Sequence, residues 1–477
     1  MDKYKKLALN TTIFALGSCG AKVFSLFLNK LYTKHISPSD FYTKRLLETL
    51  VLFLLPVFTF SITEAVVRFG LDKKYDKKQI FTTAGTILLS GLLLLIPVVP
   101  LLHLIPILKP ITGYSLLLFA YVCMSAIRAL CSQFVRSREM VILFSLDGII
   151  ATMTLFLFNV VFISKLGLGV RGFMISMILS DSLSAVLLLS VARLRKYLDK
   201  NSFSKSLGKE MLKFTVPLIP TTLIWTFTGF SDQIFIGNMH SDHVFLGETA
   251  SGVYIAANLI PNLLSMLSTI FYQAWNISTV TENDSSDRER FYERVYSAYE
   301  AVMFLGAAFL ILLVRPLSDI LLDYEGYPEY RMAYIYTPLV ILAAVFTCLN
   351  LFLSGIYTAT RHTKNAFLTL IAVAVANIIL NLALIPSWGV QGAALATFLS
   401  YLLCYCIRMI DARYYVPFNF SVIKTSANTL LILLMCIPVI FSFQYTLILE
   451  LLLTAAAFAL NYKALLFTVN KLLKKNA

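Results

Sequence analysis

Residues 79–104 read QIFTTAGTILLSGLLLLIPVVPLLHL, without one Asp, Glu, Lys or Arg. A helix of about 20 apolar residues crosses the hydrocarbon core of a bilayer, so this stretch predicts a membrane-spanning helix. Further runs of this kind occur along the whole chain, at residues 9–33, 46–69, 113–135, 141–163, 172–192, 214–237, 250–277, 296–314, 333–358, 366–386, 390–407, 425–441 and 445–467. The sequence therefore predicts an all-α polytopic membrane protein with about fourteen transmembrane helices.

The composition agrees with lipid as the main solvent. Of the 477 residues, 58% are hydrophobic and 14% are charged, and the mean hydropathy is +0.77. A soluble domain carries roughly 25% charged residues. The loops between the predicted spans are too short for a soluble catalytic domain, and they contain no ATP-binding loop, HExxH zinc motif or Ser-His-Asp context. We therefore expect a transporter and not an enzyme, with no metal site and no cofactor.

The basic residues alternate between rich and poor loops. The net charge is +14, and with a cytoplasmic N-terminus the inner segments hold 28 of the 40 Lys and Arg residues and the outer segments hold 8. This is the positive-inside distribution, and an even number of spans places both termini in the cytoplasm. The basic charge thus orients a multi-pass protein in the cell membrane, and no nucleic acid is needed to explain it.

Two short motifs divide the chain into repeats. GVRG at 169–172 is followed eight residues later by Ser180, and GVQG at 389–392 is followed eight residues later by Ser400. Each motif stands at the outer start of the sixth span of a six-span set, at an offset of 220 residues. Transporters are often built from such repeats. We predict two six-helix lobes related by a pseudo-two-fold axis, at residues 1–200 and 201–415, and a separate helix pair at 416–477.

Cations inside the predicted spans are candidates for a functional site, because a charge at a helix centre costs about 2.5–3.5 kcal/mol on insertion scales. Lys22 lies about halfway through the first span, too deep to reach the interface. We predict that it lines a water-filled cavity; the alternative is a structural ion pair, most plausibly with Asp181 or Asp232. Arg128 either lines the cavity or extends to the cytoplasmic interface.

Acids and amides inside the spans complete the candidates. Glu64 and Arg68, spaced i and i+4, either neutralise each other or contribute to substrate binding or gating. Asp181 in the sixth span and Asp232 in the seventh are candidates for coupling to Na⁺ or H⁺. Helical spacing turns two amides of the eighth span toward one side, either as a polar cavity wall or as interhelical hydrogen bonding. The substrate-binding candidates are Lys22, Arg68, Arg128, Glu64, Asn258 and Asn262.

Several motifs, in order and spacing, resemble those of the polysaccharide flippases of the multidrug, oligosaccharidyl-lipid and polysaccharide exporter superfamily. They are NTTIFALGS at 10–18, ISPSD at 36–40, EAVVRF at 64–69, SDQIFIG at 231–237, GVYIAA at 252–257, QAW at 273–275 and GVQGAALAT at 389–397. The resemblance implies two six-helix lobes around a central cavity and two further helices. It also implies alternating-access movement of an undecaprenyl-diphosphate-linked oligosaccharide from the inner to the outer leaflet, for cell-surface polysaccharide synthesis.

The resemblance further implies a monomer surrounded by membrane lipids, with a glycan polymerase and glycosyltransferases as partners. A diphosphate needs cationic, hydrated walls while its prenyl tail stays in lipid, and the movement involves no covalent chemistry. An inside-negative membrane potential favours outward movement of an anion by roughly 2.3 kcal/mol per charge per 100 mV. Either the potential or an ion gradient is therefore a sufficient driving force.

Three alternatives remain. The lipid II flippases of this superfamily carry Ser-Arg-x-x-Gly-x-x-Arg-Asp in their first helix; Lys22 matches the first basic position, whereas Leu28 and Asn29 replace the second Arg and the Asp. A drug or cation antiporter of the same fold is expected to have an acidic cavity. A membrane glycan polymerase or glycosyltransferase needs an outer loop with paired acids or arginines, and the longest outer loop, at 315–331, offers several.

Overall fold

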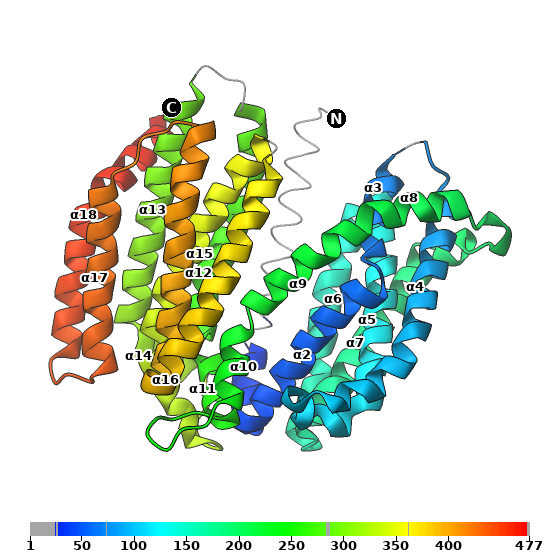
Figure 1. Cartoon of the computed structure of the whole chain (residues 1–477), viewed down its shortest axis with the longest axis horizontal. Coiled ribbons are helices and arrows are strands. Elements are labelled where there is room, and N and C mark those ends of the chain that lie inside the picture. The colour runs from blue at the N-terminus through cyan, green and yellow to red at the C-terminus, as the bar shows by residue number, and fades with distance from the viewer. Residues whose placement is uncertain (1–23, 25–26, 73, 283–286, 361, 475–477) are drawn as a thin grey trace. The chain divides into compact units, whose positions relative to one another are not determined.

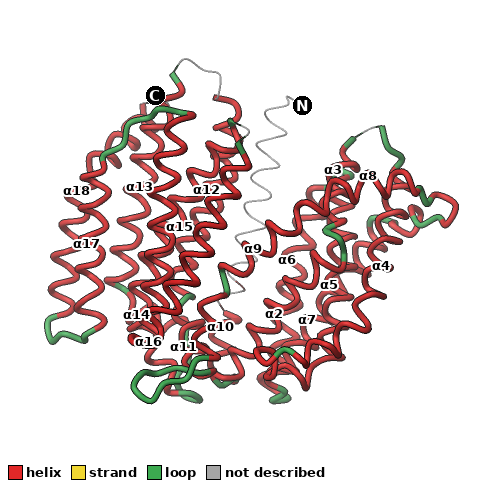
Figure 2. The backbone as a smooth tube through the Cα atoms, in the orientation of Figure 1, coloured by secondary structure: helices red, strands yellow, loops and turns green. Residues whose placement is uncertain are grey.

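The computed structural model describes residues 24, 27–72, 74–282, 287–360 and 362–474 (Figure 1). Lys22 lies outside these residues. The described part is helical throughout, with short connecting loops, and it contains no strand (Figure 2). Its α-helices are α2 (Pro38–Phe58), α3 (Ile62–Leu71), α4 (Lys77–Leu101), α5 (Ser115–Ser137), α6 (Val141–Asn159), α7 (Gly169–Val191), α8 (Lys205–Thr215), α9 (Ile219–Thr228), α10 (Ser231–Asn238), α11 (Glu248–Ala257), α12 (Leu259–Glu282), α13 (Arg288–Leu312), α14 (Val314–Leu321), α15 (Ala333–Ala359), α16 (Thr363–Tyr415), α17 (Val422–Ile440) and α18 (Thr446–Lys474).

The predicted fold class, an all-α polytopic membrane protein, is confirmed. Among the described residues, nine helices are long and apolar enough to cross a membrane, and up to eleven if each of two bent helix pairs counts as one span. The helix α16 joins two of the expected spans end to end, with Gly389 in a non-helical conformation between them. The seventh expected span is divided among α8, α9 and α10.

The second expected span bends sharply between α2 and α3. The two helices meet at 57°. Phe60 and Ser61 have φ values of 54° and 49°, in the left-handed region that only glycine adopts without strain. A Cβ atom on Gly91 of α4 would collide with the carbonyl oxygen of Phe58, so the missing side chain lets α4 approach the bend. Pro56 lies inside α2 shortly before the bend, and a proline inside a helix favours a kink.

Packing divides the chain into two compact units, Met1–Phe230 and Ser231–Ala477. In unit 1, α5 packs against α7 and α3, α8 packs against α3 and α4, and α9 packs against α2. In unit 2, α15 is the central helix, in contact with α12, α13, α16 and α17. The division falls within the seventh expected span, while the lobes at 1–200 and 201–415 remain a prediction from the order of spans.

The C-terminal helices α17 and α18 lie side by side, and α18 also packs along α13 (Figure 1). Asn428 on α17 and Asn461 on α18 exchange amide hydrogen bonds of 3.3 and 2.7 Å, and both are fully buried. Such amide pairs fix the register of two apolar helices, because in lipid neither side chain has water as an alternative partner.

The two Gly-Val-x-Gly motifs share two backbone features. The first glycine of each has a positive φ, 52° at Gly169 and 57° at Gly389. At the last glycine of each, Gly172 and Gly392, an added Cβ atom would collide with a backbone carbonyl group of the preceding segment. Each motif therefore turns the chain tightly into the next helix, and both glycine positions are required for the same steric reasons.

Candidate functional site

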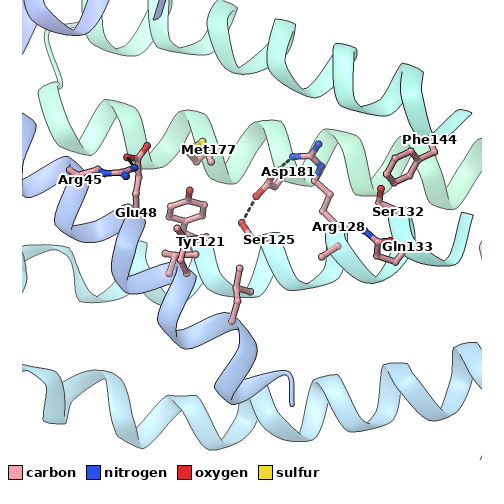
Figure 3. Close-up of a pocket in the computed structure, with 14 residues that line it drawn as sticks. Arg45, Glu48, Tyr121, Ser125, Arg128, Ser132, Gln133, Phe144, Met177 and Asp181 are labelled. Atoms are coloured by element: carbon pink, nitrogen blue, oxygen red, sulfur yellow. Dashed lines mark hydrogen bonds and ion pairs between the residues drawn. The ribbon is translucent and has the colours of Figure 1, made fainter. Parts of the chain in front are cut away.

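A pocket of about 460 Å³ opens within unit 1, lined by residues of α2, α5, α6 and α7 (Figure 3). Arg45 and Glu48 lie at one end of the pocket, and Arg128 and Phe144 lie at the other. Tyr121, Met177 and Ser125 are between the two ends (Figure 3). A partly polar wall in a helix bundle of otherwise apolar composition is the usual character of a ligand site.

At one end of the pocket, Arg128 is held by two buried carboxylates. One guanidinium nitrogen lies 2.8 Å from Oδ1 of Asp181, and the other lies 3.6 Å from Oδ2 of Asp147. Ser125 donates a hydrogen bond to Asp181, and Ser184 donates one to Asp147. The Arg128 side chain is 28% exposed, whereas the two aspartates are 4% and 2% exposed. Arg128 and Asp181 therefore both line the pocket, whereas Asp147 does not.

The other end of the pocket carries charges from Lys44 and Arg45, which lie between the spans expected at residues 9–33 and 46–69. The helix α2 begins at Pro38, because Ser37 caps it by accepting a hydrogen bond from the Asp40 amide. Lys44 and Arg45 consequently lie inside the helix and not before it. The signal was present in the sequence, since Ser-Pro-x-Asp is a helix-start pattern.

Lys44 is enclosed by aromatic rings and an acid. Its ammonium group lies 4.5 Å from the ring centre of Tyr32 and 4.4 Å from that of Phe173. It donates a 2.8 Å hydrogen bond to Glu48. Arg45 lies 3.6 Å from the other oxygen of Glu48, and its side chain is 38% exposed in the pocket. Glu48 is thus shared, and Arg45 is the more accessible of the two cations.

A second pocket of about 410 Å³ adjoins the first, because Leu55 and Ala129 line both. Glu64 lines this pocket together with Thr222 of α9. Within the described residues, no ion pair joins Glu64 to Arg68; the Arg68 guanidinium lies 4.6 Å over the ring of Phe214 instead. The expected self-neutralisation of this pair is therefore not seen.

In unit 2, Asp232 is the acceptor of a hydrogen-bond network. Tyr254 donates at 3.1 Å, the side-chain amides of Asn377 and Asn381 at 3.1 and 2.7 Å, and the Thr397 hydroxyl donates the fourth bond. Asp232 is 8% exposed, and these four partners are all neutral. The buried negative charge is thus solvated by dipoles without a cationic side chain among them, as in a site that takes a small cation or a proton.

Asp232 was predicted from the sequence as a candidate, whereas Asn377, Asn381 and Thr397 were not. The two asparagines stand one helical turn apart in an apolar run, which was the available signal. Thr397 follows the Gly389 turn, so the two halves of α16 both reach the carboxylate.

The predicted amides of the eighth span lie at another bend. Asn258 stands between α11 and α12, which meet at 44°, and its side-chain amide donates to the Tyr254 carbonyl at 2.8 Å. Asn262 is exposed. Asn258 therefore satisfies a backbone group of its own span, while Asn262 is open to a cavity or to lipid.

The sequence matches no family model and no curated protein. Among solved structures, the lipid II flippase MurJ in an inward closed conformation has a TM-score of 0.71 at 14% identity, over 95% of this chain and 100% of that chain. An inward-facing multidrug resistance MATE transporter of the MOP superfamily has 0.65 at 14%, over 83% and 95%. A mutant of the Vibrio cholerae MATE transporter VcmN has 0.60 at 10%, over 87% and 97%. At these identities the likeness establishes the fold.

Proposed function

We propose that this protein is a flippase that moves an undecaprenyl-diphosphate-linked oligosaccharide from the inner to the outer leaflet by alternating access. The observation that carries the proposal is the pocket of unit 1, in which Arg45 and Arg128 present partly exposed guanidinium groups at opposite ends. The fold shared with MurJ and the MATE transporters supports a transporter. Glycosyltransferases would act before the flippase, and a glycan polymerase would act after it.

The two arginines suit a diphosphate group. A guanidinium binds phosphate oxygens through two parallel N–H donors, which an ammonium group cannot do. In the predicted topology α2 runs inward from its outer start near Arg45, and α5 runs inward past Arg128, so the two cations lie at different depths. A diphosphate that moves through the pocket therefore meets a cation near each membrane face.

The pocket is charge-balanced before the substrate arrives. Lys44, Arg45 and Arg128 supply three positive charges, and Glu48, Asp147 and Asp181 supply three negative charges. When the substrate binds, its phosphate groups thus replace the carboxylates as partners of the arginines. This exchange keeps substrate binding weak enough for release. A permanently free cation in the membrane interior would hold a diphosphate too tightly and would be expensive to insert.

Coupling to an ion gradient would use Asp232. Its four neutral partners, in unit 2, include side-chain amides whose oxygens can turn toward a bound Na⁺, and Asn381 Oδ1 is buried without a hydrogen-bond partner. Protonation of Asp232 would equally remove the buried charge. In unit 1, Asp181 remains a second coupling candidate, although it is paired with Arg128.

A cation antiporter is the second candidate function. The cluster of Arg128, Asp147 and Asp181 carries one more negative than positive charge when all three are ionised, which favours a cationic ligand. A lipid II flippase differs from the first proposal only in the glycan, so the same assay compares them.

Transport by purified protein in vesicles tests the proposal. Fluorescent undecaprenyl-diphosphate oligosaccharide, lipid II and a cationic dye would be supplied in parallel, and outer-leaflet arrival would be read with a membrane-impermeant glycan-modifying enzyme. We expect flipping of the first lipid, a strong decrease in Arg45→Gln, and normal flipping in Arg171→Gln, a control at an exposed position of α7. Dye transport without lipid movement would overturn the proposal in favour of the antiporter. Movement of lipid II alone would identify lipid II as the substrate instead of the proposed oligosaccharide lipid.

A further inference from the structure

A pocket of about 290 Å³ lies in unit 2 between α14 and the start of α15. It belongs to the segment that the positive-inside distribution places outside the membrane. Its lining consists of two arginines, two tyrosines and one acid: Arg315, Asp319, Tyr324, Arg331 and Tyr334. Neither the transport pocket in unit 1 nor the Asp232 network uses these residues.

The sequence builds this pocket from a short amphipathic helix. In α14, Val314, Ser318 and Leu321 are buried, and this turns Arg315 and Asp319, which are one helical turn apart, to the exposed side. The buried ring of Tyr330 anchors the chain before α15, so that Arg331 and Tyr334 follow at a defined position. The pocket is therefore supported by residues that cannot move freely.

Each arginine is laid over a tyrosine ring. The Arg315 guanidinium lies 5.1 Å from the ring centre of Tyr334, and that of Arg331 lies 5.7 Å from the ring centre of Tyr324. Within the described part of the chain, neither arginine forms an ion pair, although Asp319 lines the same pocket. Stacking fixes the plane of a guanidinium while its N–H edge remains available to an anion.

Asp319 affects the acidity of the neighbouring Tyr324. Burial and the neighbouring Asp319 raise the pKa of Tyr324, so its hydroxyl group remains protonated at neutral pH. With Asp319 ionised, two arginines and one acid give the lining one net positive charge. An anion is attracted, while the carboxylate remains an acceptor for a hydroxyl group next to that anion.

We propose that this outer pocket binds one acidic sugar residue, with the sugar carboxylate between Arg315 and Arg331 and a ring hydroxyl donating to Asp319. The volume of about 290 Å³ lies just below the range of about 300–1,000 Å³ for ligand pockets, which suits one ring and not an extended chain. If the protein is a flippase, the sugar is part of the glycan that reaches the outer face; this last step alone rests on the proposed function.

Binding is measured with small probes on the full-length protein in nanodiscs of neutral lipid. Methyl glucuronide, methyl glucoside and acetate would be titrated and followed by ligand-observed NMR, which detects weak ligands. We expect saturable binding of the glucuronide only. Loss of a charge-assisted hydrogen bond weakens binding by at least about tenfold, so Arg315→Gln and Arg331→Gln should each show this loss.

Two further variants keep the test decisive. Arg413→Gln is the matched control, because Arg413 also stacks on an aromatic ring, 5.4 Å from Phe420, but near the end of α16. It should bind like the wild type. Asp319→Asn should bind acetate more tightly and lose the preference for glucuronide over acetate, whereas a merely electrostatic patch has no such preference to lose.

Several results would overturn the inference. They are the absence of glucuronide binding in folded protein, equal binding of the glucoside, and equal loss in Arg413→Gln. None of these depends on transport. Failure of the lipid-flipping assay with intact glucuronide binding would instead remove the proposed function and leave the sugar site.

Discussion

Replacing Arg128 by Gln should destabilise unit 1, because the change leaves two buried carboxylates without their cation. At an effective dielectric constant of about 20, the distances of 2.8 and 3.6 Å correspond to attractions of about 6 and about 5 kcal/mol. Desolvation of the three groups offsets most of this attraction. Removal of one partner from a buried pair costs about 3–5 kcal/mol, and the 28% exposure of Arg128 favours the lower end, about 3 kcal/mol.

Thermal unfolding of the detergent-purified protein measures this loss. Cys131 on α5 is 2% exposed and unpaired, so in a background whose other six cysteines are replaced by serine, a dye that fluoresces on reaction with thiols reports the opening of unit 1. For a unit of this size, a loss of about 3 kcal/mol lowers the melting temperature by about 6–12 °C. Arg136→Gln, at an exposed position of the same helix, should change it by less than about 0.5 kcal/mol.

The triple variant Arg128→Gln, Asp147→Asn, Asp181→Asn separates stability from transport. It removes the acids together with the cation, so most of the lost stability should return. Neither Arg128→Gln nor the triple variant should flip lipid, because both lack the guanidinium group. An Arg128→Gln protein that melts like the wild type would refute the reasoning about buried charge. Full flipping by the triple variant would remove Arg128 from the transport pathway.

Three further predictions concern other parts of the chain. If Asp232 holds a cation, wild-type protein should melt at a higher temperature in NaCl than in choline chloride, and Asp232→Asn should show no difference between the salts. Gly389→Ala should lower the free energy of unfolding by about 1 kcal/mol or more, because φ at this position is 57°. Gly148→Ala in α6, which has open space around it, should raise the free energy of unfolding by about 0.5–1 kcal/mol. Equal melting shifts in the two variants would contradict the requirement for glycine at position 389. Ser241→Cys should react with a membrane-impermeant thiol reagent from outside and Ser202→Cys only after permeabilisation, and the reverse pattern would invert the topology.

The helical class was predictable because a run of apolar residues encodes a membrane helix within itself. The Gly-Val-x-Gly turns were likewise visible, since glycine is required wherever φ is positive or another backbone approaches closely. Helix starts were less secure: α2 begins eight residues before the apolar run at residue 46, because Ser37 caps a first turn that carries polar and charged residues.

The partners of the charged residues were not predictable from the sequence. Arg128 meets Asp147 and Asp181 across three helices, and apolar periodicity does not tell which faces of α5, α6 and α7 meet. Asp147 satisfied the same criterion as Asp181, a lone acid in an apolar run, and should have been a candidate. Arg408 comes directly after the span expected at residues 390–407, yet it is 6% exposed and donates to the carbonyl of Asn350 at 2.9 Å.

The enclosed lysine of α2 has a consequence for biosynthesis. In the predicted topology Lys44 stands near the outer start of its helix, so the newly made chain would carry this charge across the bilayer against the preference for basic residues inside. Glu48 is one helical turn further along and can accept from Lys44 as soon as that turn forms. Phe173 is synthesised much later. The ion pair would therefore let the segment cross with one charge cancelled, and the ring of Phe173 would enclose Lys44 only after α7 has arrived.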